Sequence, residues 1–413
     1  MEASASISAK GDFKMIPLER AVSLAEAEQR IDQCLTALGL TCTLVRHGAP
    51  MSSTVATLHG ADEQPGEREG CGKGHPDEAR VGAKFEAYEH FHAVRALRDA
   101  TLMTCFADVI AQHTLVDVLP ARMLSAQRAS LIGVIRFDAP GNDAAPLHYP
   151  TFLIDHTYAS SPLPGDDVDY QAVRRYACGT GLAAGVGATE ALVHALGEVI
   201  ERHAVGTWIA QTYYRKRPGC ERTIDPATLP ATLAHLLEQA SNELEAPIVL
   251  SYARSDIDCP VVIARCRDRQ IAGLHVAGSG ASLYPAHAAA RAIKELVQQY
   301  KVAEGERQAM QHWNACVRRF QRWPRLQPCL ILPPGDADQE QVAFSALGGE
   351  QHPLDLDAHL RALRQRCQSA QRPVWTRVLR EDAGGVALAC ACMPRMERFA
   401  IAALGGVVVP TYA

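Results

Sequence analysis

Three segments of this sequence carry an acidic residue three positions before a second glutamate or glutamine. The pairs are Glu86 with Glu89, Glu198 with Glu201, and Glu295 with Gln298. Positions i and i+3 of a helix share one face, about 5–6 Å apart at Cβ. Apolar residues flank each pair, so we expect these faces to pack inward, where two carboxylates repel each other by about 3 kcal/mol at an effective dielectric near 20. Hard cations such as Mg²⁺ neutralise carboxylates of this kind and share them with substrate phosphates.

A Glu-x-x-Glu pair on its own is more often a solvated helix edge, because charged residues are mostly exposed. The threefold recurrence, and the Gly-containing stretch before each copy, favour a functional site. These stretches, 72–74, 179–187 and 278–282, predict turns, and a helix N-terminus that follows such a turn can bind phosphate. Small residues also permit close helix packing, which stays the alternative. Lys73 is either a cation directed at phosphate or an ordinary surface lysine.

The elements that must position these residues follow from periodicity, caps and breakers. We expect helices at 23–38, 76–97, 99–113, 189–208, 226–246, 285–302, 305–322 and 357–369. We expect strands at 41–46, 53–58, 130–137, 152–156, 248–252, 260–267, 271–277, 374–380 and 386–393. Residues 1–15 read as a loose tail, and 61–74, 138–150 and 160–170 as loops. Helices mixed with hairpin-like strand runs predict an α+β fold with mixed and antiparallel sheets.

Composition excludes several classes of protein. The chain has 413 residues, 47% of them hydrophobic, and a net charge of −5, which is ordinary for a globular protein and disfavours a general nucleic-acid binder. The sequence shows no signal peptide and no apolar run long enough for a bilayer, so we expect no membrane partner. The thirteen cysteines are scattered without a Cys-x-x-Cys pair, which argues against a zinc ribbon and indicates reduced thiols in the cytoplasm.

The motifs around the acidic pairs resemble those of the YcaO-domain family. The matching segments are Gly72-Lys73-Gly74 with Glu86-x-x-Glu89, Gly181–Gly185 with Glu190 and Glu198 to Ala204, Arg291 to Gln298, and Met393 to Phe399 followed by Gly406 and Pro410. The second is the most specific, because many matching positions occur at fixed spacing. The resemblance covers roughly residues 65–413 and implies a YcaO-like catalytic domain there. It leaves residues 1–64 as an N-terminal segment of one helix and two strands.

The resemblance implies an enzyme that uses ATP and Mg²⁺ to activate a backbone amide of a ribosomally made precursor peptide, giving an azoline or a thioamide. Three acidic helices would surround the nucleotide. By position, the resemblance assigns Mg²⁺ to Glu86, Glu89, Glu198 and Glu201, and ATP to Lys73, Glu190, Arg202, Glu295 and Gln298. Arg202 could instead pair with Glu198 one turn away. The family further implies a separate leader-binding partner, of the TfuA type or like a ubiquitin-activating enzyme, and a homodimer is possible.

Five positions depart from the family pattern by losing polar groups that could face phosphate or metal. They are Gly82, His90, Ala183, Val186 and Tyr300. These departures support an alternative, a degenerate YcaO-like scaffold or substrate-presenting subunit without catalysis. A third class, an ATP-dependent ligase of small molecules or a sulfur-transfer accessory protein, also stays open.

Overall fold

The computed structural model describes residues 16–60, 68–112, 118–139, 145–305, 307–334 and 340–411. Its helices are α1 (Leu24–Ala37), α2 (Pro76–Asp99), α3 (Phe106–Ala111), α4 (Leu119–Met123), α5 (Ala188–Ile209), α6 (Ala231–Glu243), α7 (Pro285–Gly305), α8 (Arg307–Phe320), α9 (Gln327–Ile331) and α10 (Leu356–Ser369). Its strands are β1 (Thr41–His47), β2 (Ser52–His59), β3 (Glu69–Gly74), β4 (Thr101–Cys105), β5 (Leu131–Phe137), β6 (Leu147–Pro150), β7 (Leu182–Val186), β8 (Thr223–Ile224), β9 (Ile248–Tyr252), β10 (Val261–Cys266), β11 (Ala277–Ala281), β12 (Gln341–Val342), β13 (Trp375–Glu381) and β14 (Val386–Cys392).

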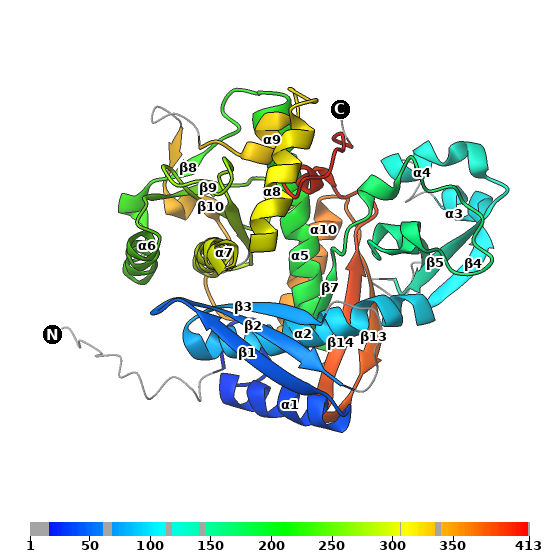
Figure 1. The fold of residues 1–413 in the computed structure, drawn as a ribbon, viewed down its shortest axis with the longest axis horizontal. Coiled ribbons are helices and arrows are strands. Elements are labelled where there is room, and N and C mark those ends of the chain that lie inside the picture. The colour runs from blue at the N-terminus through cyan, green and yellow to red at the C-terminus, as the bar shows by residue number, and fades with distance from the viewer. Residues whose placement is uncertain are drawn as a thin grey trace.

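The strands form separate small sheets rather than one large one. Their orders are β1-β2-β3, β4-β5-β6, β13-β14-β7 and β11-β10-β9-β8-β12, and every pairing is antiparallel except β8 with β12. Figure 1 shows α5 at the centre, with sheet β1–β3 and α2 below it and the sheet of β9 and β10 beside it. The predicted α+β class is confirmed. The strands on either side of residue 64, β2 and β3, pair within one sheet.

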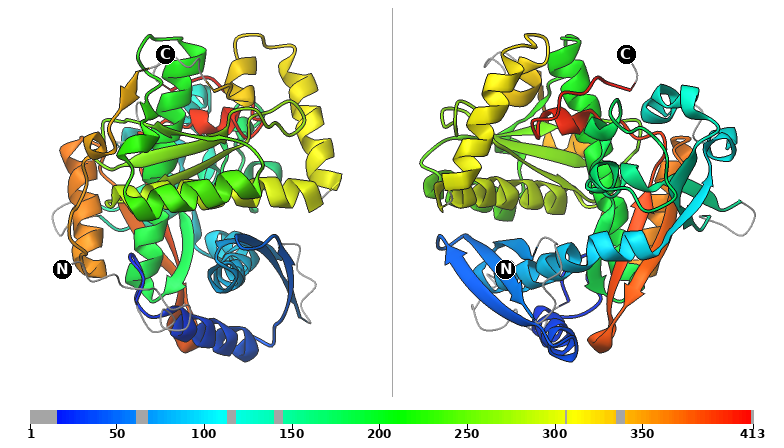
Figure 2. Two further views of the ribbon diagram at one scale, coloured as in Figure 1. Left: turned by 90° about the vertical axis from the view of Figure 1, so that its left-hand side faces the viewer. Right: turned by 45° about the vertical axis from the view of Figure 1, so that its right-hand side comes forward.

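The largest core surrounds α5, which is apolar on most of its surface. Leu196, Ile200 and Ile209 are fully buried there and pack with residues of β10, α10 and the segment after β14. Figure 2 shows α5 running through the middle of the molecule between the sheets. Burial of this helix is worth roughly 1.5–3 kcal/mol for each large apolar side chain. A buried α5 therefore fixes its polar residues in space.

The Gly-rich stretches before the acidic helices are strands, not the turns that we predicted. Strand β3 leads into α2, β7 leads into α5, and β11 leads into α7. These are three strand–helix pairs. Glycine lets each helix lie directly on its strand: a Cβ at Gly72 would come 1.7 Å from the carbonyl oxygen of Ala79, and one at Gly278 would come 2.2 Å from that of Ala292. The close-packing alternative therefore explains these glycines, and Lys73 lies on β3 rather than in a loop.

Other boundaries also differ from expectation. The predicted helix at 99–113 is strand β4 followed by the short helix α3, where β-branched and apolar residues pair with β5. A 3-10 turn at Thr151–Leu153 replaces the strand predicted at 152–156, and the strand predicted at 271–277 starts later, as β11. The tail predicted for 1–15 lies outside the described residues, as do 61–67 and 140–144 of the predicted loops. No helix in the described part of the chain is long and apolar enough to cross a bilayer.

Candidate active site

The three strand–helix pairs are joined into a ring by the second residue of each acidic pair. Glu89 of α2 accepts the N–H of Ala184 in β7 (3.1 Å), and Glu201 of α5 accepts the N–H of Ala281 in β11 (3.2 Å). Gln298 of α7 donates its amide to the carbonyl of Cys71 in β3 (2.5 Å).

Each helix of the ring therefore reaches the strand of the next pair. The three strands lie at the edges of their sheets in the described structure. Their outer backbone N–H and C=O groups have no strand partner there, so they can hydrogen-bond to these side chains.

The first residues of the pairs face the same region. Glu198 accepts the N–H of Gly181 (3.1 Å), just before β7, and Glu86 accepts the backbone N–H of Cys71. Glu295 of α7 pairs with Lys73 of β3 (2.5 Å), at the junction that Gln298 and Cys71 also form. The structure thus brings the acidic residues of three distant segments together, as the repeat predicts.

Electrostatic repulsion within this group is only partly relieved. Burial, together with the charges of Glu198 and Glu86, raises the pKa of Glu89 well above its ordinary value. Burial also raises the pKa of Glu198, and Arg202 offsets only part of the rise. The same holds for Glu86, whose raised pKa reflects burial that His90 and Lys73 offset in part. A group of carboxylates with raised pKa values is poised to gain from a divalent cation.

Glu295 behaves in the opposite way. Burial would raise its pKa, but Lys73, Arg202 and Arg291 outweigh burial and lower it. Arg202 also lies 3.6 Å from Glu198 on its own helix, which is the local pairing that the sequence left open. Arg291 was not among the predicted site residues, although it belongs to the third motif. Its guanidinium lies between Glu19 (3.7 Å) and Glu201 (4.0 Å).

An N-terminal segment that the sequence did not assign to the site reaches this group. Arg20 pairs with Glu190 (3.2 Å), and the backbone N–H of Ala21 donates to the same carboxylate (2.8 Å). Glu19 is 8% exposed and accepts the hydroxyl of Ser282 (2.5 Å). No motif marks Glu19 and Arg20, so only their tertiary contacts identify them.

Glu19 lies in a cage of cationic and polar groups. Besides Arg291, it faces His287 (3.6 Å) and His359 (3.5 Å). Burial would raise the pKa of Glu19, but these neighbours and the Ser282 hydroxyl outweigh burial and lower it. The cage is thus built for an anion, and a carboxylate of this chain fills it.

The departures from the family pattern have structural roles of their own. Tyr300 is fully buried and donates its hydroxyl to the carbonyl of Arg269 (2.7 Å). The ring of His90 contacts the carbonyl of Glu69 (2.6 Å). Gly82 lies against Gly72, while Ala183 and Val186 are buried in β7. These positions support packing or hydrogen bonds within the protein.

The acidic residues fit a shared cation rather than a complete metal cage. Within the residues that the structure describes, no three His, Cys, Asp or Glu side chains are arranged to hold a metal ion by themselves. Mg²⁺ commonly binds one or two carboxylates and completes its shell with waters and substrate phosphates. The paired glutamates, with the cations Lys73, Arg202 and Arg291 close by, match that chemistry for a magnesium–nucleotide complex.

Comparisons with known proteins identify the family of this chain. The family model described as YcaO cyclodehydratase, ATP- and Mg²⁺-binding, matches residues 71–397. A comparison with curated protein sequences gives no significant match.

Solved structures of this kind share the fold. The YcaO of Methanopyrus kandleri bound with AMPPCP and Mg²⁺ has a TM-score of 0.64 and 19% identity, over 94% of this chain and 96% of that one. A heterocyclase in complex with substrate and cofactor has a TM-score of 0.66 and 16% identity, over 93% of this chain and 55% of that one. The Escherichia coli microcin synthetase McbBCD complex has a TM-score of 0.57 and 12% identity, over 87% and 88%.

Proposed function

Because this chain belongs to the YcaO family of ATP- and Mg²⁺-binding cyclodehydratases, we propose that it activates a backbone amide of a ribosomally made precursor peptide. The product is an azoline when a side chain of the peptide attacks the amide carbon, and a thioamide when an external sulfur donor does. The observation that carries the proposal is the closed ring of three strand–helix pairs, which gathers glutamates from α2, α5 and α7 beside Lys73, Arg202 and Arg291.

We assign the magnesium side of the site to Glu86, Glu89, Glu198 and Glu201. Burial and neighbouring carboxylates raise the pKa of both Glu89 and Glu198, so both would gain from a cation. Glu201 is held by the hydroxyl of Ser279 (2.6 Å) as well as by β11, which fixes its direction. A carboxylate that is already held in place loses less side-chain entropy when it binds a metal.

We assign the nucleotide side to Lys73, Glu190, Arg202, Glu295 and Gln298. Lys73 and Arg202 supply positive charge, and Glu295 holds Lys73 in place. Gln298 holds β3 through the carbonyl of Cys71, and Glu190 holds the N-terminal segment through the N–H of Ala21. Both residues therefore shape the walls of the proposed nucleotide site. When bound, ATP would supply the phosphoryl group that activates the amide oxygen, and Mg²⁺ would neutralise phosphate charge. The protein contributes positioning and charge, which is what phosphoryl transfer requires.

The partners we propose are the precursor peptide and a separate leader-binding protein, of the TfuA type or like a ubiquitin-activating enzyme. The fold shared with the McbBCD microcin synthetase complex supports an assembly with further subunits. The proposal also includes a homodimer of this chain. We place the reaction in the cytoplasm, where ATP and newly made peptide are available.

The test is phosphate release and peptide mass measured with precursor peptide, partner protein, ATP and Mg²⁺. We expect loss of one water for an azoline, or exchange of oxygen for sulfur with a sulfur donor. Glu198→Gln should lower phosphate release by about 100-fold or more, because it removes a charge directed at the metal. Glu238→Gln, on the exposed face of α6, is the matched control. Unchanged turnover in Glu198→Gln would contradict the assignment.

One observation favours the second candidate, a scaffold or substrate-presenting subunit without catalysis. Glu19 pairs with Arg291, and Arg20 pairs with Glu190. Side chains of this protein therefore already neutralise two charged groups of the candidate site. Calorimetry with ATP and Mg²⁺ separates the two candidates. Micromolar, Mg²⁺-dependent binding supports the enzyme, and absence of binding in the presence of the partner supports the scaffold.

A further inference from the structure

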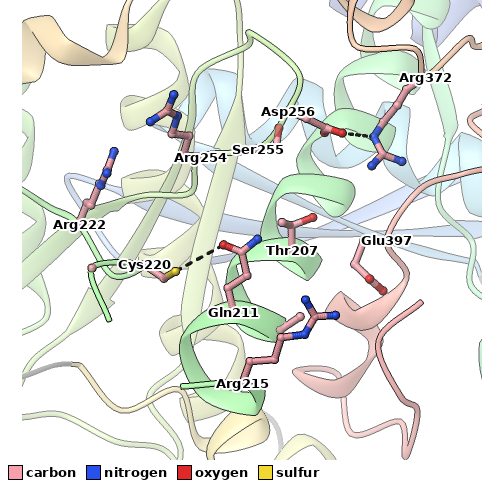
Figure 3. Close-up of a pocket in the computed structure, with 12 residues that line it drawn as sticks. Thr207, Gln211, Arg215, Cys220, Arg222, Arg254, Ser255, Asp256, Arg372 and Glu397 are labelled. Atoms are coloured by element: carbon pink, nitrogen blue, oxygen red, sulfur yellow. Dashed lines mark hydrogen bonds and ion pairs between the residues drawn. The ribbon is translucent and has the colours of Figure 1, made fainter. Parts of the chain in front are cut away.

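A polar cavity lies at the C-terminal end of α5, away from the acidic ring. It encloses about 460 Å³, within the range of ligand sites. Its walls come from the end of α5, the π-helical turn after it (Ala210–Tyr214), the loops after β9 and α10, and the segment before Phe399. Figure 3 shows side chains from these separate segments facing one space. The cavity therefore depends on the tertiary fold, and Glu397 is the one lining residue that lies in a segment resembling the family.

The cavity is richer in cations than in anions. Its lining contains Arg215, Arg222, Arg254 and Arg372 but only two carboxylates, Asp256 and Glu397. The whole chain has a net charge of −5, so this positive site is a local feature rather than part of a basic surface.

Both carboxylates are already engaged within the protein. Asp256 accepts from His203 (2.8 Å) and Arg372 (2.5 Å). Burial would raise the pKa of Asp256, but these two hydrogen bonds and charges outweigh it and hold the pKa at about 2. Glu397 is 3% exposed and accepts the backbone N–H groups of Phe399 (3.0 Å) and Thr411 (3.0 Å).

Two guanidinium groups thus keep their charge for a ligand. Arg222 faces Glu340 (3.6 Å), whereas Arg215 and Arg254 have no carboxylate partner within the described residues. They come from different segments, one after α5 and one after β9. Thr207, Gln211 and Ser255 also line the wall. The Oε1 atom of Gln211 accepts from Cys220 and the Ser255 hydroxyl pairs with the backbone of Ile257, so the side-chain N–H₂ of Gln211 and the hydroxyl of Thr207 are the neutral groups left for a ligand.

We propose that this cavity binds an acidic stretch of a peptide, with Arg215 and Arg254 pairing with its carboxylates. A guanidinium binds a carboxylate through two parallel hydrogen bonds, and the neutral groups suit a peptide backbone. The inference rests on the proposed function in one respect: it takes the bound peptide to be the precursor substrate or its leader.

Binding of short fluorescent peptides to the full chain, measured by anisotropy without ATP, tests this site. We expect a peptide with two or three glutamates to bind, and the same peptide with glutamines to bind about tenfold more weakly or less. The double variant Arg215→Gln and Arg254→Gln should lose this discrimination. Arg318→Gln, an exposed arginine on α8, is the control and should keep it.

Three results would overturn the proposal. They are equal binding of the glutamate and glutamine peptides, unchanged discrimination in the double variant, and displacement of the acidic peptide by millimolar inorganic phosphate or pyrophosphate, which would make the cavity a phosphate site. Calorimetry of ATP and Mg²⁺ on the double variant keeps the two proposals apart. If the double variant binds nucleotide normally but no longer binds the peptide, the peptide site lies in this cavity. If the unaltered chain binds no nucleotide, the proposed function is contradicted, and the peptide-binding inference is unaffected.

Discussion

At the scale of single residues, each contact of the ring depends on whether the side chain faces a backbone N–H or a backbone carbonyl. Glu89 and Glu201 accept N–H groups, which suits a carboxylate. Gln298 faces the carbonyl oxygen of Cys71, which needs a donor. The third pair therefore has a glutamine in its second position because the group that it contacts on β3 is an acceptor, and a glutamate could not donate to it.

Gln298→Glu should destabilise the protein by about 1–3 kcal/mol, because a carboxylate would face a carbonyl oxygen in a buried place. Thermal or urea unfolding measures the loss. Gln299→Glu, next to it on the exposed face of α7, is the control and should change stability by less than about 0.5 kcal/mol. Equal stability of the two variants would show that the contact with Cys71 does not close the ring.

Glu89→Gln should stabilise the chain when no divalent cation is present, by about 1 kcal/mol at pH 8. The pKa of Glu89 is raised in the folded state, so its carboxyl supports folding while protonated and loses that contribution as pH rises above its ordinary range. The gain should therefore fade as pH falls towards 5. Thermal unfolding with and without Mg²⁺ provides the measurement. Mg²⁺ should stabilise the unaltered chain more than the variant, and equal Mg²⁺ effects would argue against a metal at Glu89.

At the scale of elements, the strand–helix pair is the repeated part. Each consists of an edge strand and the helix that lies on it, with glycine where the two backbones meet. The sequence shows the glycines and the helices clearly. It does not distinguish a turn from a short Gly-rich strand, because glycine has low strand propensity and is typical of both turns and close contacts.

Gly72→Ala should cost several kcal/mol or prevent folding, since its Cβ would collide with the backbone of α2. Gly82→Ala is the matched control within α2, where the nearest atom would be the Cα of Gly72 at 3.6 Å. Alanine there should raise stability by about 0.5–1 kcal/mol through helix propensity. Denaturant unfolding of both variants decides the matter. Similar behaviour of the two would mean that β3 does not need to lie directly on α2.

At the scale of the whole molecule, the N-terminal segment ties distant elements to the ring. Glu19 contacts residues just after β11, on α7 and on α10, and Arg20 contacts α5. The residues before α1 therefore belong to the same structural unit as the site. In the site that we propose, a nucleotide would share Arg291 with Glu19.

Glu19→Gln should lower the free energy of unfolding by about 1–3 kcal/mol at pH 7, because it removes the buried carboxylate that Arg291 and the Ser282 hydroxyl face and leaves only the more distant Glu201 beside Arg291. The pKa of Glu19 is lowered in the folded state, so its contribution is present above the ordinary pKa of 4.5 and is lost as pH falls below it. The difference from the unaltered chain should shrink below pH 4.5. Stability measured from pH 3 to 8, with Glu26→Gln as an exposed control, checks this. A difference independent of pH would exclude an ionic role for Glu19.

The sequence by itself determined the α+β class, most helix positions, the threefold acidic repeat and the resemblance to the YcaO family, because periodicity and motif spacing are local properties of the chain. Only the tertiary structure decided which strand edge each acid contacts, since the partners Gln298 and Cys71 are 227 positions apart, and Glu89 and Ala184 are 95 apart. The same holds for the role of Glu19 and for the arginine cavity. Hydrogen bonds and charge pairs between distant segments form only when hydrophobic burial has brought the elements together, and no local pattern encodes them.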